Sequence, residues 1–157
     1  MYLLKILGAR GIMAAATLIA LAVSAITDAR RRVLPVALYP LLLVTAAILD
    51  LGVFSANPQQ YILTGVIFGL LFLAQALFFE GGGGDVILML VMGLIYGLVP
   101  MLIMVFASAF ASVIWYALAA ILRGKVIHGR MTFPYAPFLA VGFVVYLLIF
   151  MNMGGIS

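Results

Sequence analysis

Residues 78–91 read FFEGGGGDVILMLV, so four glycines and an aspartate stand between two strongly apolar runs. The first run covers residues 61–79, and the second, residues 86–122, carries no charged side chain over 37 residues. As one helix at about 1.5 Å per residue, the second run would reach about 55 Å and overshoot a hydrocarbon layer of about 30 Å. It therefore predicts two spans, with the turn at Gly97 and Pro100.

The composition is typical of a membrane protein. Of the 157 residues, 68% are hydrophobic and only 8% are charged, which is more apolar surface than one small soluble core can bury. The absence of cysteine excludes a disulfide framework and a thiolate metal site. Although the net charge is +4, the basic residues border apolar runs, where membrane topology signals lie. We therefore predict contacts with the lipid bilayer and no nucleic-acid partner.

The hydrophobic pattern predicts an all-α polytopic membrane protein with about six transmembrane helices and both termini outside. The connecting segments are short and show no shift in composition, so residues 1–157 are expected to form a single membrane-embedded domain. The predicted spans are approximately residues 11–27, 33–53, 61–79, 86–99, 101–122 and 131–151.

The basic residues predict the orientation. Two spans separate Asp28 from Asp85, and two more separate Asp85 from residues 123–130, so all three regions should emerge on the same face. That face would carry six basic residues against two on the other, and an excess of Lys and Arg marks the cytoplasmic side. The six are Arg30, Arg31, Arg32, Arg123, Lys125 and Arg130, and the two are Lys5 and Arg10.

An alternative interpretation of the N-terminal segment is a cleavable signal peptide. Lys5 and Arg10 precede an apolar run that ends in VSA. Cleavage after Ala25 would leave Asp28 as the third residue of the mature chain and would leave five spans.

Each of the four acidic residues has a structural interpretation. Asp50 lies near the outer end of the second span, where an interfacial carboxylate needs no special role. Glu80 ends the third span and can extend into cytoplasmic water. Asp28 stands four residues before Arg32, the spacing of a helical ion pair. Asp85 begins a helix and can complement the helix dipole.

The glycine run at residues 81–84 favours a further role for Asp85. Glycine weakens a helix, so four in succession indicate that the chain is unwound there or is approached closely by another backbone. An extended peptide beside an unwound segment could satisfy its backbone groups as an added strand. A phosphate-binding loop is not supported, because no Gly-Lys-Ser/Thr follows.

Asp28 and Asp85 lie at helix ends on the same predicted face, where they could form an acid–base pair. Two carboxyl groups within a few ångströms of each other share one proton, and the pair titrates with two separated apparent pKa values. The ionised partner can take a proton from water while the protonated one polarises a peptide carbonyl. His128, the one histidine, has no second imidazole or cysteine with which to hold a metal, and no serine nucleophile elbow is present. We expect no metal and no cofactor.

Three blocks of sequence carry a resemblance to the type IV prepilin peptidases and preflagellin peptidases, which are GxGD intramembrane aspartyl proteases. The blocks are Asp28-Ala29-Arg30 with Leu34-Pro35, then Gly82-Gly83-Gly84-Asp85-Val86, and finally residues 133–140, FPYAPFLA. They follow the family's order over most of the chain. Larger members carry a cysteine-rich insert and a methyltransferase activity, neither of which this sequence supports. The chain resembles the compact peptidases of tight-adherence (Flp) pilus systems or the archaeal preflagellin peptidases.

The resemblance implies that Asp28 and Asp85 are catalytic and that the protein cuts the leader of pilin-like precursors at the cytoplasmic membrane face. The cut would typically follow a glycine preceded by basic residues. Family members commonly have a lysine where this chain has Ile87 and an asparagine at Val36, so the polar support around the acids differs here. The implied substrate-binding residues are Gly82, Gly83, Gly84 and Glu80, and the implied structural residues near the site are Pro35, Pro134 and Pro137.

Two other classes of function stay open at this point. A non-catalytic subunit of pilus or secretion assembly could keep this fold, with its acids serving only in ion pairs and helix caps. A small transporter could use a glycine-broken helix and buried acids to bind a cation or proton. Replacing either aspartate by asparagine would abolish cleavage in a peptidase and ion-coupled flux in a transporter, whereas an assembly subunit would tolerate the change.

Overall fold

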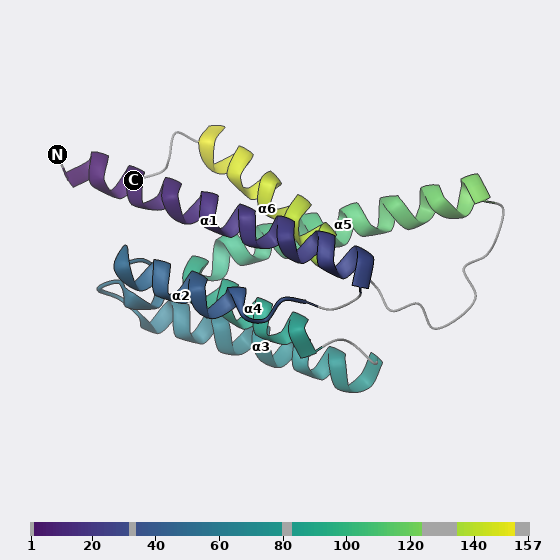
Figure 1. The fold of residues 1–157 in the computed structure, drawn as a ribbon, viewed down its shortest axis with the longest axis horizontal. Helices are drawn as coiled ribbons and strands as arrows, with labels where there is room; N and C mark the ends of the chain where they lie inside the picture. Colours follow the sequence, from purple (N-terminus) through teal and green to yellow (C-terminus); the bar gives the residue numbers. More distant parts are fainter. Residues whose placement is uncertain (1, 32–33, 80–82, 124–134, 153–157) are drawn as a thin grey trace.

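The computed structural model describes residues 2–31, 34–79, 83–123 and 135–152 (Figure 1). These residues form helices and contain no strand, which confirms the predicted all-α class. The elements are α1 (Tyr2–Arg31), α2 (Leu38–Ile48), a short 3-10 turn η1 (Gly52–Phe54), α3 (Gln59–Phe79), α4 (Gly83–Tyr96), α5 (Leu98–Arg123) and α6 (Tyr135–Asn152).

Three helices are long and apolar enough to cross a membrane, namely α1, α3 and α5. Their apolar segments are Gly8–Asp28, Gln59–Phe78 and Leu98–Leu122. The apolar segments at α2, α4 and α6 are shorter. Six crossings and the placement of the termini therefore stay predictions.

The second predicted span is wrong as one continuous helix over residues 33–53. Helix α2 ends at Ile48, because Asp50 adopts a left-handed backbone (φ 51°) and Gly52 another (φ 62°). At Gly52, a Cβ atom would lie 2.5 Å from the carbonyl oxygen of Leu94. The chain therefore turns here and packs closely on α4, which only glycine allows.

The division of residues 86–122 into two helices is confirmed. Gly97 has a left-handed backbone (φ 76°) and separates α4 from α5. Pro100 lies within the first turn of α5, where a missing N–H breaks no helical hydrogen bond. The turn is therefore made by Gly97, and Pro100 is compatible with the helix that follows.

The helices pack in one bundle, beyond which the C-terminal part of α5 extends (Figure 1). Helix α3 packs on α4, α5 packs on α6, and α1 contacts both α6 and α2. The C-terminal end of α1 and the N-terminal ends of α4 and α6 point to the same end of the molecule. This arrangement follows from the alternating direction of successive helices.

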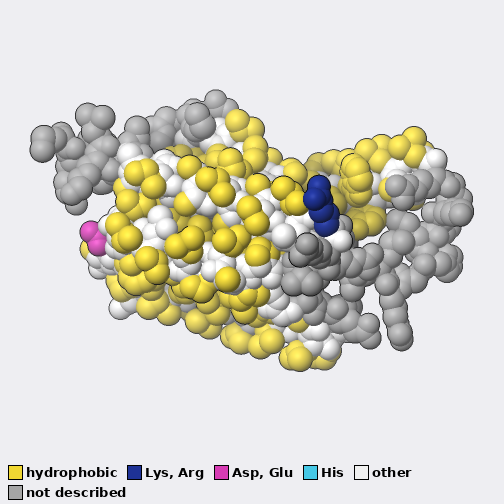
Figure 2. Space-filling model, viewed as in Figure 1, with side chains coloured by type: hydrophobic (Ala, Val, Ile, Leu, Met, Phe, Trp, Pro, Cys, Tyr) yellow, Lys and Arg dark blue, Asp and Glu magenta, His cyan; other side chains and the backbone are white. Residues whose placement is uncertain are grey.

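The visible surface is dominated by hydrophobic side chains (Figure 2). Phe78 is 80% exposed and Leu122 is 82% exposed, which water would penalise strongly. Such large exposed side chains on apolar helices fit contact with lipid tails. Together with the three long apolar helices, this surface indicates a membrane protein.

Candidate functional site

Asp28 lies near the C-terminal end of α1 and is buried, with 9% of its surface exposed. Its Oδ2 atom accepts a hydrogen bond of 3.3 Å from the backbone N–H of Ala136. Ala136 is the second residue of α6, where backbone N–H groups have no partner within the helix. The carboxylate therefore ties the start of α6 to the end of α1, and the helix dipole of α6 stabilises its negative charge.

Asp85 lies in the first turn of α4 and is partly buried. Its Oδ1 atom is buried without a hydrogen-bond partner among the described residues. The charge of Asp28 acts on the Asp85 carboxylate, so the two acids lie within electrostatic range of each other. The structure thus brings the two predicted acids together at one end of the bundle.

Three polar side chains near the acids were missed by sequence reasoning. The charges of Asp28 and Asp85 both act on the Tyr39 hydroxyl of α2, and the charge of Asp85 acts on Tyr135 of α6. The Tyr39 hydroxyl also lies beside that of Ser24, but neither oxygen meets hydrogen-bond geometry with any described residue. Ser24 alone had a sequence signal, since it stands one helical turn before Asp28.

Tyr135 is held in place by contacts with two other helices. Its hydroxyl shares a 3.1 Å hydrogen bond with Ser108 Oγ of α5. Its ring packs against Phe72 of α3, with centroids 5.1 Å apart. The hydrogen bond and the ring contact therefore hold Tyr135 in place, with its hydroxyl within the electrostatic influence of Asp85.

The predicted unwinding of the glycine run is wrong at Gly83 and Gly84, because α4 begins at Gly83. A Cβ atom on Gly84 would lie 2.8 Å from Cβ of Leu34, so the absent side chain makes room for this leucine. No atom lies within 4 Å of the corresponding position on Gly83, which leaves open space there. Gly82 and Glu80 lie outside the described residues, and peptide binding by this segment stays a prediction.

Two of the three predicted structural prolines lie at helix starts. The carbonyl of Pro35 accepts a 2.9 Å hydrogen bond from the N–H of Leu38, the first residue of α2. Pro137 lies in the first turn of α6, where its fixed backbone angle suits the helix. Pro134 lies outside the described residues.

The two departures from the family pattern are both partly exposed. Ile87 is 40% exposed and Val36 is 39% exposed. Within the described part of the chain, polar groups near the acids come instead from Ser24, Tyr39 and Tyr135. The polar groups described near the acids are therefore hydroxyl groups.

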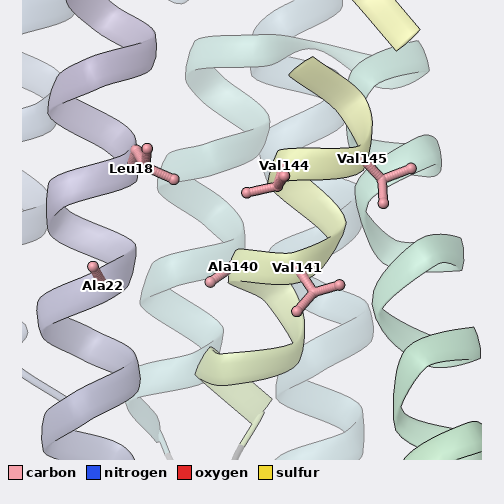
Figure 3. Close-up of a pocket in the computed structure, with 6 residues that line it drawn as sticks. All are labelled: Leu18, Ala22, Ala140, Val141, Val144 and Val145. Atoms are coloured by element: carbon pink, nitrogen blue, oxygen red, sulfur yellow. The ribbon is translucent and has the colours of Figure 1, made fainter. Parts of the chain in front are cut away.

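A separate groove lies between α1 and α6 (Figure 3). It is lined by apolar side chains alone, and Leu18 and Val141 at its edge are 39% and 46% exposed. No lining residue can transfer a proton. The groove therefore suits lipid or another apolar helix and is not the site of chemistry.

Among the described residues, no three His, Cys, Asp or Glu side chains gather in a group that could hold a metal. Asp50, the third described acid, is exposed near the end of α2, away from the pair. The arrangement therefore offers two carboxylates with nearby hydroxyl groups, which is suited to moving protons between water and a polar substrate.

A model of the type IV leader peptidase family matches residues 15–117. The match covers more than half of the chain and includes both Asp28 and Asp85, although it ends before residues 133–140. No curated protein and no solved structure matches this chain. The resemblance drawn from the three sequence blocks is confirmed, and the chain belongs to the type IV leader peptidase family.

Proposed function

We propose that this protein is a multi-pass aspartic endopeptidase of the cell membrane that removes the leader peptide from type IV pilin-like precursors. Membership of the family implies a peptidase. The observation that carries the aspartic assignment is that Asp28 and Asp85, from separate helices, lie near enough for the charge of Asp28 to act on the Asp85 carboxylate. No other described acid accompanies them.

In the proposed mechanism, the two carboxyl groups share one proton. The ionised carboxylate takes a proton from a water molecule as its oxygen attacks the carbonyl carbon of the scissile peptide bond. The protonated partner donates to the carbonyl oxygen and stabilises the tetrahedral intermediate. Transfer of a proton to the departing amine then breaks the C–N bond and releases leader and mature chain.

We place the acid pair at the cytoplasmic face of the membrane. Arg30 is exposed two residues after Asp28, and in the sequence the other basic residues of the predicted cytoplasmic face stand at or after the C-terminal ends of α1 and α5. An excess of Lys and Arg marks that side in membrane proteins. The precursor's leader would then meet the acids where it emerges from the bilayer.

The proposal is tested with the purified full-length chain in lipid vesicles and a panel of prepilin-like precursors. We expect a single cut at the leader junction, identified by the masses of both products. If no precursor is cut while the protein stays folded, the peptidase assignment falls. A non-catalytic assembly subunit would then be favoured, because the hydrogen bond from Ala136 to Asp28 also fits a purely structural carboxylate.

Glu80, which lies outside the described residues, is proposed to bind basic residues of the leader. Glu80→Gln is expected to raise KM about two- to fivefold with little change in kcat, which matches the roughly 0.2–1 kcal/mol of an exposed ion pair. Steady-state kinetics on the wild-type precursor measures this. The control is a precursor whose basic residues are replaced by glutamine, for which the effect should vanish. An unchanged KM for the normal precursor would end the idea.

A further inference from the structure

Tyr39 is fully buried, and its hydroxyl has no hydrogen-bond partner among the described residues. Folded proteins pair almost all of their buried polar atoms, because an unpaired one has lost its water without replacement. An unpaired tyrosine hydroxyl is therefore a feature that needs a reason. Phenylalanine would fill nearly the same space at this position without that penalty.

The other buried side-chain atoms without a partner in the described part of the chain belong to the same cluster. They are Ser24 Oγ and Asp85 Oδ1. Ser24 lies beside the Tyr39 hydroxyl, and the charge of Asp85 acts on that hydroxyl more strongly than the charge of Asp28 does. Two unpaired hydroxyl oxygens, from α1 and α2, thus lie near an unpaired carboxyl oxygen of the proposed acid pair, whereas isolated packing faults would be scattered.

The pairing that is missing is chemically complementary. The tyrosine hydroxyl can donate one hydrogen bond and can also accept, while the Asp85 carboxyl group can accept in either protonation state and can donate when protonated. A hydrogen bond between the two groups would fix the orientation of the carboxyl group.

We propose that Tyr39 is a positioning residue whose hydroxyl forms a hydrogen bond with Asp85 when precursor and water occupy the site, and so orients the Asp85 carboxyl group for proton transfer. This inference rests on the proposed function.

The test compares Tyr39→Phe with Tyr96→Phe, its matched control. Tyr96 is the last residue of α4, far along the helix from Asp85, and its hydroxyl shares a 2.6 Å hydrogen bond with Thr17. Tyr39→Phe is expected to lower kcat at least tenfold, to leave KM within twofold and to leave or raise the melting temperature. Tyr96→Phe is expected to lower the melting temperature and to leave kcat within twofold. A merely structural tyrosine would not produce this opposite pattern.

Three results would overturn the inference while the proposed function stands. Tyr39→Phe would cut within twofold of wild type, or its loss of activity would be accompanied by an equal loss of thermal stability. Alternatively, Ser24→Ala would reproduce the full kinetic effect, which would make Ser24 the partner that matters in place of Asp85. If wild type cuts no precursor, or if Asp85→Asn remains active, the proposed function fails first and the role of Tyr39 fails with it.

Discussion

Asp28→Asn and Asp85→Asn are each expected to lower kcat for leader cleavage by about 10²–10⁴-fold, the usual contribution of a positioned acid or base. Asparagine has nearly the same shape but cannot carry or transfer the shared proton. At residue 28 its amide oxygen can still accept the hydrogen bond from Ala136, so the contact between α1 and α6 should survive. Product formation by mass spectrometry and the melting temperature, measured on the same samples, check both expectations.

The double variant sharpens this prediction. Because the two carboxyl groups act as one unit, removing both should cost little more activity than removing either. If each acid had an independent structural role, the losses would instead add. Cleavage by either single variant within twofold of wild type would contradict the assignment of the pair.

Asp50→Asn is the matched control for the acid variants. It makes the same chemical change at an exposed carboxylate near the end of α2. Asp50 has a left-handed backbone (φ 51°), which asparagine adopts readily, so the fold should not suffer. Activity and melting temperature should both remain those of wild type.

Gly142→Ala is expected to give the largest loss of stability, roughly 1–3 kcal/mol or more, as for other overpacked sites. A Cβ atom on Gly142 of α6 would overlap the carbonyl oxygen of Met104 and lie 3.2 Å from the backbone nitrogen of Ser108. Both contacts are with the backbone of α5, so the two helices would have to separate. Small residues permit such close approach between membrane helices.

Unfolding in detergent, followed by circular dichroism, measures this loss. The control is Gly11→Ala in α1, where no atom lies within 4 Å of the new Cβ position. There the better helix propensity of alanine should stabilise the protein by up to about 1 kcal/mol. Equal stability of the two variants would show that α5 and α6 do not pack through Gly142.

The helical class and most helix boundaries followed from sequence because their causes are local. Long uncharged runs allow only helices in lipid, and Gly97 marks a turn by its own backbone preference. The second span failed for a tertiary reason, since Asp50 and Gly52 turn the chain so that it packs on α4. Nothing in the apolar pattern of residues 33–53 indicates that turn.

The sequence by itself determined that Asp28 and Asp85 stand at helix ends, and it predicted an even number of spans between them and therefore one face for both. Tertiary structure alone decided that Ala136 donates to Asp28 and that Tyr39 and Tyr135 lie near the acids. The physical reason is that these helices are apolar on every side, so no contrast of polar and apolar faces encodes their rotation. Close packing at positions such as Gly142 sets that rotation, and with it the side chains that surround the acid pair.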